Sequence, residues 1–342
     1  MEQPHNRFSQ LRAEAVDDGW TEPEQESVIR THLMQDPSRS LISWNNSPDL
    51  PFDRSINPFK GCEHGCIYCF ARPTHAYLDL SPGLDFETRI FFKPNAAELL
   101  RRELSSKSYR CAPIGIGTNT DPWQPAERKL GITRQILEVL SEFNHPVTIV
   151  TKSTGIERDL DILQSLAERG LVLVHMSICT LDTTLSRRME PRAAAPGSKL
   201  VTLEKLVARG IPTGLIFAPV IPVLNDSEIE RVLESSAAAG ASFAHYIMLR
   251  LPHEVAPLFR SWLEEFYPLK KDHIMNRVQD LRGGKDYRAS FGERLRGRGV
   301  FARLIEDRFN KARERLSFGP EPELDTSQFQ VPGTPDQLTL FS

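Results

Sequence analysis

Three cysteines within eight residues constrain this chain more than any other feature of its sequence. They are Cys62, Cys66 and Cys69, in the stretch GCEHGCIYCF, with the spacing C-x3-C-x2-C. Three thiolates on one short loop can hold three irons of a [4Fe–4S] cube and leave the fourth iron open to a small molecule. Thiolates also bind zinc, with His64 or His75 as a fourth ligand, but zinc sites favour paired C-x2–4-C motifs. The spacing therefore favours an open iron–sulfur site over zinc.

Composition predicts a cytoplasmic globular protein. The 342 residues are 40% hydrophobic and 25% charged, which suits a water-soluble chain large enough for one α/β barrel. The formal net charge of −3 predicts no overall attraction to nucleic acid, so any such contact needs a local basic patch. No apolar run is long enough to span a membrane, and the first residues lack a signal-peptide core. Five cysteines, three of them clustered, indicate a reducing compartment rather than a disulfide framework.

The cysteine spacing resembles the signature of the radical S-adenosylmethionine (SAM) superfamily, and the aromatic Tyr68 directly before Cys69 fits that signature. The resemblance implies that SAM chelates the open iron through its amino and carboxylate groups. It also implies that an electron, supplied by a donor such as flavodoxin or ferredoxin, cleaves SAM to methionine and a 5′-deoxyadenosyl radical. The expected cofactors are therefore one [4Fe–4S] cluster and SAM, with Tyr68 among the cofactor contacts.

Strands and helices alternate along the middle of the chain, as is typical of parallel βαβ units. The expected strands are 53–58, 114–119, 147–152, 171–179, 213–220 and 245–249, with a further strand at 85–93. The expected helices are 25–34, 70–80, 95–105, 134–143, 158–168, 199–208, 226–239 and 255–266. Six such units resemble the partial (β/α)6 TIM-like barrel of radical SAM enzymes. In parallel α/β folds the active site lies at the carboxyl ends of the strands.

Other segments surround the barrel, which is expected to span residues 51–270. Residues 1–50 are polar and weakly periodic, and we expect an irregular N-terminal arm there. Residues 271–315 are a basic C-terminal extension. Residues 316–342 contain many Pro, Glu and Gly residues, and this composition predicts a flexible tail.

Polar residues follow two of the predicted strands at the ends where a cofactor would bind. Lys152 and Ser153 end the 147–152 strand; the lysine either pairs with the SAM carboxylate or is an ordinary solvated charge. The turn after the 114–119 strand is either a binding segment for the SAM amino group or an ordinary Asx turn. Its residues are Thr118, Asn119, Thr120 and Asp121.

The later strands supply candidates for both cofactor contact and hydrogen-atom transfer. Alternation places Ser177 and Cys179 on one face; if that face lines the barrel, Ser177 contacts cofactor and Cys179 is a candidate hydrogen-atom donor. A small buried hydrophobic residue is the commoner role for such a cysteine. Tyr246 is the second candidate donor and shares a face with Arg250, where both would meet substrate, although Tyr246 can equally be a packing residue.

Two loops complete the predicted cofactor cradle. Arg192 carries a guanidinium suited to a carboxylate or phosphate. Pro219 belongs to the apolar run APVIP at the end of the fifth predicted strand, which we expect to cradle the adenosyl group.

Several short motifs together resemble a narrower group, the bacterial radical SAM proteins related to spore photoproduct lyase, which reverses a UV-induced thymine dimer. These motifs are GTNTDPWQPAE (117–127), TKS (151–153), EPRAAAP (190–196), APVIPVLND (218–226) and LRLP (249–252). The lyase has a cysteine hydrogen-atom donor just ahead of the acidic residue in its second turn, and here that turn has no cysteine. Cys179 would have to substitute for it, so thymine-dimer reversal itself is not expected.

The preferred hypothesis is a radical SAM enzyme that acts on damaged or modified nucleic acid. A second hypothesis keeps the enzyme class with RNA, a peptide or a small metabolite as substrate. A third is a non-catalytic, zinc- or cluster-bearing module that binds the DNA sliding clamp.

The C-terminal part of the chain supplies two further links to DNA. The stretch 281–303 either grips a phosphate backbone or is a solvated basic surface; its basic residues are Arg282, Lys285, Arg288, Arg294, Arg296, Arg298 and Arg303. The sequence QLTLF near the end resembles the pentapeptide that docks bacterial repair proteins on the DNA sliding clamp. Its predicted contact residues are Gln337, Leu338, Leu340 and Phe341.

Overall fold

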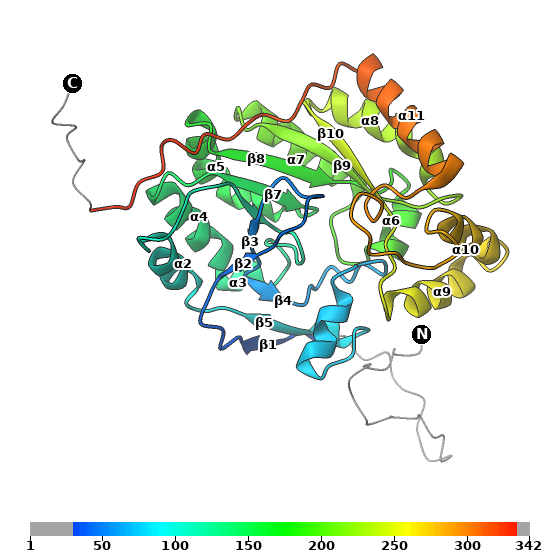
Figure 1. Cartoon of the computed structure of the whole chain (residues 1–342), viewed down its shortest axis with the longest axis horizontal. Helices are drawn as coiled ribbons and strands as arrows, with labels where there is room; N and C mark the ends of the chain where they lie inside the picture. Colours follow the sequence, from blue (N-terminus) through cyan, green and yellow to red (C-terminus); the bar gives the residue numbers. More distant parts are fainter. Residues whose placement is uncertain (1–29, 334–342) are drawn as a thin grey trace, which may run out of the picture.

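The main sheet has the strand order β10-β9-β8-β7-β6-β3-β2 in a computed structural model that describes residues 30–333 (Figure 1). Six of these strands run parallel in sequence order: β3 (Arg54–Ile56), β6 (Ile114–Ile116), β7 (Val147–Thr151), β8 (Val172–Ser177), β9 (Thr213–Val220) and β10 (Ala244–Met248). The seventh, β2 (Ile42–Trp44), pairs antiparallel with β3 at one edge. The predicted partial (β/α)6 TIM-like barrel is therefore confirmed.

Helices cover the outer face of this sheet. The principal ones are α2 (Ala96–Leu104), α4 (Ile132–Glu142), α5 (Leu160–Glu168), α7 (Pro196–Ala208) and α8 (Ile229–Ala238). Helix α9 (Val255–Phe266) packs instead in a separate apolar cluster with Ile221 and Leu249, which follow β9 and β10. Helix α4 buries Ile136, Leu137 and Leu140, which lie on one face at helical spacing. In β8, Val174 and Met176 join this core, and the intervening residues face the interior of the barrel. Two helices, α10 (Lys271–Asp280) and α11 (Gly299–Arg315), follow the barrel.

The N-terminal arm is more regular than its composition predicts. A helix was expected at 25–34, but the described part contains β1 (His32–Gln35), which pairs in parallel with β5 (Arg89–Phe92). Strand β5 also pairs with β4 (Phe59–Lys60), and it follows a short helix, α1 (Asp85–Thr88), where one long strand was expected. These strands are held by partners far away in the sequence, so the local pattern does not reveal them.

The open side of the barrel is closed by hydrogen bonds between chain segments that are nearly 250 residues apart in the sequence. Strand β10 is an edge strand, and the amide of Met248 donates a hydrogen bond to the carbonyl of Leu295 (2.8 Å). On the opposite edge, Asp49 follows β2 and accepts hydrogen bonds from the amide of Gly292 (2.7 Å) and from Nε of Arg294 (2.6 Å). The loop 291–296 therefore connects the two edges of the incomplete barrel, which protects both from pairing with other chains.

Residues 316–333, expected to belong to a flexible tail, follow an ordered path that we call the strap. It runs from α11 across the amino ends of the strands (Figure 1). Backbone hydrogen bonds join Gly319 to Ser242 (2.8 Å) and Asp325 to Gly170 (3.0 Å). The Phe329 ring packs on His145 with 5.4 Å between ring centroids. Apolar side chains spaced along the strap, such as Phe329, pack against the barrel and explain why the strap follows an ordered path. A composition rich in Pro and Glu does not predict this path. The predicted clamp-binding residues 337–341 lie outside the described residues.

No helix in the described range 30–333 is both long enough and apolar enough to cross a bilayer.

Truncating the aromatic anchor of the strap should destabilise the whole protein. Phe329→Ala is expected to lower the free energy of unfolding by about 2 kcal/mol, less than the roughly 3–5 kcal/mol typical of a fully buried Phe, because this ring is only partly buried. Anaerobic urea unfolding of the full chain measures the change. Leu269→Ala, at a fully exposed position, is the control. Equal stability of the two variants would show that the strap contributes nothing to the fold.

Candidate active site

The cysteine loop, residues 61–70, connects β4 to the 3₁₀ helix η1 (Arg72–Leu78). It is held on both sides by backbone hydrogen bonds, from Cys62 to the carbonyl of Phe86 (2.9 Å) and from Ile67 to the carbonyl of Met189 (3.0 Å). Gly65 has a φ of +67°, and a Cβ there would lie 2.5 Å from the guanidinium of Arg192. A glycine is therefore required where the loop turns beneath this arginine.

Arg72 is the residue that organises this loop, and it is almost fully buried. Its guanidinium donates hydrogen bonds to the carbonyls of Cys66 (2.9 Å) and Gly65 (3.0 Å) in the loop. It also donates to the carbonyls of Pro82 (3.1 Å) and Gly83 (2.8 Å) and pairs with the carboxylate of Glu87. One side chain thus satisfies loop carbonyls that have no strand partner.

The three loop cysteines are free thiols, with Cys62 and Cys66 buried and Cys69 partly exposed. Burial raises the pKa of Cys62 well above its ordinary value and that of Cys66 to about 12, so these thiols ionise readily only beside a cation. One zinc ion with Zn–S bonds of about 2.3 Å holds its sulfurs within about 4.6 Å of one another. Among the described residues, one group of three potential metal ligands has its ligand atoms within 4.8 Å of one another, and this group lies away from the cysteine loop. An iron–sulfur cube is favoured over a single zinc ion by the C-x3-C-x2-C spacing of the sequence.

The two histidines considered as a fourth zinc ligand have different surroundings. His75 uses Nε2 in a hydrogen bond with the carbonyl of Arg89 (3.0 Å) and packs edge-on against Phe86. His64 is buried, and its Nδ1 lies 3.6 Å from Asp121 without a hydrogen bond. Burial lowers the pKa of His64, which keeps the ring neutral beside the cysteine loop.

The turn predicted to bind cofactor is connected to both the cysteine loop and the next strand. Asp121 accepts hydrogen bonds from Oγ1 of Thr151 (2.9 Å) and from the amide of Lys152 (2.9 Å). Thr120 donates through Oγ1 to the carbonyl of Phe59 (3.0 Å) at the entrance to the loop. The remaining two turn residues bind a single side chain: the amide of Asn57 contacts Oγ1 of Thr118 (3.3 Å) and accepts from the amide of Asn119 (3.0 Å). The structure therefore brings all four predicted turn residues to the carboxyl ends of the strands beside the cysteines.

Behind this turn lies a buried charge network centred on Glu190. Its carboxylate accepts a hydrogen bond from the Tyr68 hydroxyl and from Nζ of Lys199 (2.6 Å), and Nζ of Lys152 lies 4.0 Å away. Burial alone would raise the pKa of Glu190, but Lys199 and Lys152 outweigh it and lower that pKa to about 2. Burial likewise opposes the charge of Lys152, yet Cys66 and Glu190 raise its pKa overall. Lys152 is thus a charged ammonium that is only loosely paired.

Two predicted cofactor contacts have structural partners instead. Ser153 donates through Oγ to the carbonyl of Trp123 (2.8 Å) and accepts from the amide of Gly155 (3.0 Å), so it caps the 3₁₀ helix η2 (Thr154–Asp159). Arg192 donates to the carbonyl of Glu63 in the cysteine loop and pairs with Glu87. Its role in the structure is to hold the loop.

The ends of β8 and β9 meet at Asn225. Its Nδ2 donates to the carbonyls of Cys179 (2.6 Å) and Pro219 (2.9 Å), and the peptide bond before Pro219 is cis. The Cys179 side chain is buried in an apolar cluster that also contains Ile67 of the cysteine loop. Burial raises its pKa well above the ordinary value, which keeps the S–H bond that a hydrogen-atom donor needs. Ser177 is buried at the end of β8.

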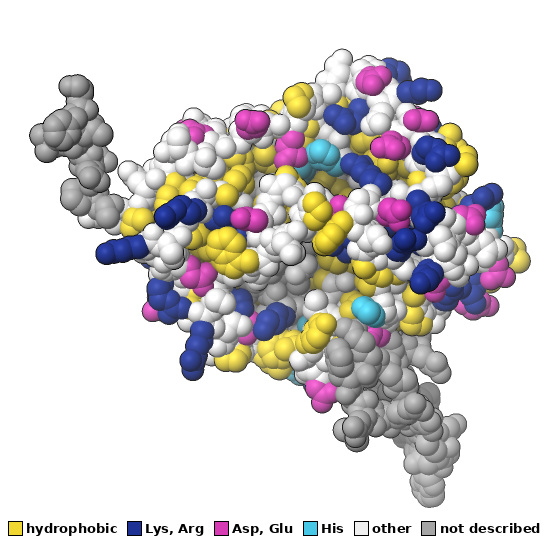
Figure 2. Space-filling model, viewed as in Figure 1, with side chains coloured by type: hydrophobic (Ala, Val, Ile, Leu, Met, Phe, Trp, Pro, Cys, Tyr) yellow, Lys and Arg dark blue, Asp and Glu magenta, His cyan; other side chains and the backbone are white. Residues whose placement is uncertain are grey.

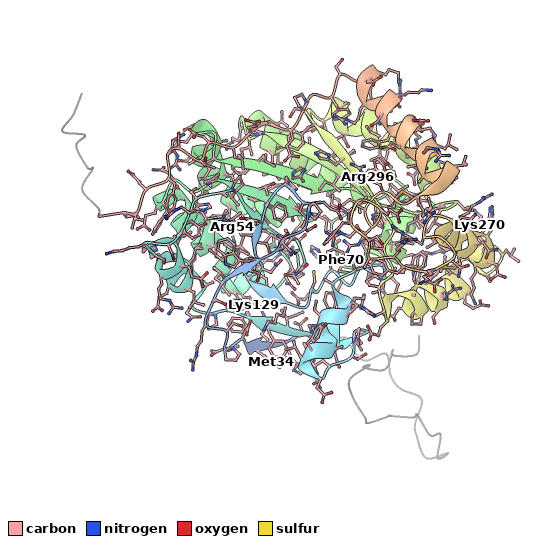
Figure 3. All side chains as sticks on the ribbon, in the orientation of Figure 1. Met34, Arg54, Phe70, Lys129, Lys270 and Arg296 are labelled. Atoms are coloured by element: carbon pink, nitrogen blue, oxygen red, sulfur yellow. The ribbon has the colours of Figure 1, made fainter. Side chains whose placement is uncertain are left out.

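Tyr246 does not lie with these residues, which corrects its assignment as a candidate hydrogen-atom donor. Its ring packs on Phe309 of α11 (4.8 Å between centroids), and the guanidinium of Arg296 lies 4.1 Å above it. It therefore belongs to the outer core, where aromatic packing decided its position. Arg250, predicted to share its face, instead stacks 4.4 Å from the ring of Phe70, which ends the cysteine loop near the middle of the molecule (Figure 3).

Several residues of the site carry no recognisable signal in the sequence. Arg72 and Glu87 follow the cysteines without a motif, and Lys199 lies within an ordinary helix. Glu190 precedes Pro191 in the quoted motif EPRAAAP, which was the one available indication.

A cavity of about 550 Å³ lies on the other side of the cysteine loop, between α6 (Thr183–Met189) and α9. Its wall includes Gly65 and four arginines, Arg72, Arg187, Arg188 and Arg192.

The fold and the site define a class of protein, that of incomplete parallel barrels with a loop of three cysteines at the carboxyl ends of the strands. A family model described as the radical SAM superfamily matches residues 56–235, more than half of the 342 residues. The chain belongs to the radical SAM superfamily, and it is a radical SAM enzyme.

Relatives cover most of the chain. Uncharacterized proteins of Mycobacterium tuberculosis and Mycobacterium bovis are each 36% identical over 299 residues, which span 86% of this chain and 84% of theirs. An uncharacterized protein of Methanocaldococcus jannaschii is 24% identical over 225 residues, 65% of this chain and 80% of its own.

Solved structures of spore photoproduct lyase share the fold. A mutant with bound AdoMet and dinucleoside spore photoproduct has a TM-score of 0.60 and 16% identity, covering 84% of this chain and 79% of that one. A complex with dinucleoside spore photoproduct has a TM-score of 0.59 and 18% identity, covering 84% and 80%. The predicted resemblance to this group is therefore confirmed at the level of the fold.

Removing the buried guanidinium should release the cysteine loop. Arg72→Met is expected to cost about 3–5 kcal/mol of stability, because it leaves loop carbonyls unsatisfied and Glu87 with one partner fewer. Iron bound after anaerobic reconstitution should fall with it. Arg89→Met, half-exposed and paired only at the surface with Asp85, is the control. Wild-type iron content and thermal stability in Arg72→Met would contradict a central role for this residue.

Proposed function

We propose that Cys62, Cys66 and Cys69 hold one [4Fe–4S] cluster and that SAM binds its open iron. The observation that carries the proposal is the largely buried loop of three cysteines at the carboxyl ends of a superfamily barrel. Bound together, the cluster and SAM supply the 5′-deoxyadenosyl radical of the superfamily, which abstracts a hydrogen atom from substrate. An electron donor such as flavodoxin or ferredoxin belongs to the same proposal.

The residues around the loop have charges suited to SAM. Lys152 is charged and loosely paired, so it can bind the SAM carboxylate without losing a close partner. The 118–121 turn offers backbone carbonyls and the exposed amide of Asn119 to the SAM ammonium. Tyr68, Ser177 and Pro219 remain proposed cofactor contacts at the same strand ends.

The cluster ligands can be tested by a cysteine comparison. Cys66→Ala is expected to bind clearly less than the about four irons per chain of a complete cube and to lose formation of 5′-deoxyadenosine from SAM and dithionite. Cys111→Ala, at a partly exposed cysteine outside the loop, should keep both. Iron and 5′-deoxyadenosine are measured after anaerobic reconstitution. Bound zinc with no SAM cleavage in the wild-type chain would overturn the proposal.

The proposed substrate is a damaged or modified base in nucleic acid. The fold is that of an enzyme whose solved structures contain a dinucleoside photoproduct. Directly after Cys69, the partly exposed Phe70 is stacked by Arg250. An aromatic ring and a guanidinium plane are the surfaces on which unpaired bases stack. Cys179, a protonated thiol packed in the same apolar cluster as Ile67 of the loop, is the proposed hydrogen-atom donor.

The distribution of charge on the surface gives the basic C-terminal extension only a minor role in the proposed binding of nucleic acid. Figure 2 shows basic side chains over α10 and α11 interspersed with acidic ones, rather than a continuous positive surface. Arg282, Arg294 and Arg296 of the 281–303 stretch are used in internal contacts, with Leu249, Asp49 and Tyr246 respectively.

The substrate class can be tested with UV-irradiated, deuterium-labelled DNA. The reduced enzyme is expected to transfer deuterium into 5′-deoxyadenosine with this DNA and not with undamaged DNA. Phe70→Ala should lower kcat/KM by about tenfold, within the roughly 1–3 kcal/mol of one base–aromatic stack, and leave SAM cleavage without substrate unchanged. Tyr77→Ala, a more exposed aromatic residue on η1, is the control. Deuterium transfer only from RNA or from labelled cell extract would reject damaged DNA and keep the radical chemistry.

A further inference from the structure

Three side chains with metal-binding atoms meet inside the barrel, near its amino end. His175 comes from β8, His245 from β10 and Glu321 from the strap. One ligand atom of each lies within 4.8 Å of the others, and this is the one such group found in the range 30–333. None of the three belongs to the cysteine loop or to the residues that surround it.

The neighbouring residues create room for two imidazoles side by side. Strand β9 lies between β8 and β10, and its residue opposite His175 is Gly214. A Cβ on Gly214 would lie 2.2 Å from the Phe243 ring, so the glycine makes room for this aromatic residue. Phe243 in turn packs edge-on against His175 at 5.1 Å between centroids, and the His175 and His245 rings are 5.7 Å apart.

The polar contacts among the three residues are incomplete without a further group. Oε2 of Glu321 lies 2.8 Å from Nε2 of His245 but 3.6 Å from Nε2 of His175, which is beyond a hydrogen bond. Nδ1 of His175 is buried without a hydrogen-bond partner among the described residues. A cation bound by Nε2 of His175, Nε2 of His245 and Oε2 of Glu321 would join into one ligand set two atoms that are too far apart to hydrogen-bond.

We propose that His175, His245 and Glu321 bind one divalent transition-metal ion, with zinc as the best match, and that this ion fastens the strap to the barrel. Two histidines and one glutamate are an established zinc ligand set, completed by water. The carboxylate balances part of the charge, and burial lowers the pKa of His175, which favours the neutral imidazole that metals require. The ion joins β8 and β10 to the strap and plays no part in the radical reaction.

The test uses the full-length, untagged chain with its cluster loaded, so that the loop cysteines are occupied. After removal of loosely bound metal, one equivalent of zinc is added and the protein is desalted. The wild-type chain is expected to retain about one zinc per chain, with nitrogen and oxygen neighbours at about 2.0–2.1 Å in the zinc K-edge absorption spectrum. Sulfur at about 2.3 Å would instead place zinc on the cysteines.

Variants separate the proposed site from adventitious binding. Glu321→Gln and His245→Gln should weaken zinc binding by at least about tenfold, because each removes a ligand. Glu323→Gln, an exposed residue two positions along the strap, should bind like wild type. Iron content and SAM cleavage should be unchanged in all three, which shows that each variant folds. Iron content and SAM cleavage are measured without substrate, so the test of the zinc site does not depend on the proposed substrate.

A protease measures the consequence for the strap. Zinc is expected to slow chymotrypsin cleavage at Phe329 in wild type and in Glu323→Gln, but not in Glu321→Gln. Failure of the wild-type chain to retain zinc, a sulfur-only coordination shell, or equal zinc affinity in Glu321→Gln would each overturn the proposal. A wild-type strap that is equally protected with and without zinc would overturn its fastening role.

Discussion

The active site depends on one buried guanidinium. A loop that presents three thiols to a cluster cannot be part of a strand or a long helix, so its carbonyls lack the partners that regular structure provides. Arg72 supplies them, with donors directed at Gly65 and Cys66 in the loop and at the chain after η1. Glu87 neutralises this charge and simultaneously pairs with Arg192, which holds the other side of the loop. Because each unsatisfied buried carbonyl costs about 1–3 kcal/mol, the loop conformation is a property of this network rather than of the cysteines.

A second network sets the charge available for a ligand. Glu190 and Lys199 form a buried pair that is internally balanced, and the Tyr68 hydroxyl satisfies the remaining carboxylate oxygen. Lys152 adds a positive charge 4.0 Å from that carboxylate, so the group as a whole is cationic. Buried charge without a partner is unfavourable, and the nearby thiols and an incoming carboxylate are the groups that can balance it. The anchoring of the loop and the pairing of the buried lysines therefore depend on separate acidic residues, Glu87 and Glu190.

The sequence predicts the elements that depend on a local pattern, and it misses the elements and residues that depend on contacts with distant parts of the chain. The six barrel strands and the helix at 255–266 follow from apolar periodicity, and the cysteine loop follows from spacing. Strand β1 and the strap were missed because their hydrogen bonds go to residues roughly 50 or more positions away, while their own composition is polar. Arg72 and Glu190 were missed for the same reason: the partners that bury a charge are set by the fold. The alternation of residues along β10 does not tell which of its two faces points outward. The packing of Tyr246 against α11 shows that its face is the outer one.

Arginines of the C-terminal extension help to close the incomplete barrel. Six parallel strands leave two edges open, and the loop 291–296 joins them by pairing Arg294 with Asp49 and by hydrogen-bonding to β10. Arg282, almost fully buried, donates to the carbonyl of Leu249 just after β10. These two arginines bind backbone and acidic groups of the barrel itself and so help to close the fold. The strap covers the amino ends of the strands in the same way. The remaining opening is the carboxyl end, where Phe70 and Arg250 lie beside the cysteine loop, and this is the place for the proposed nucleic-acid substrate.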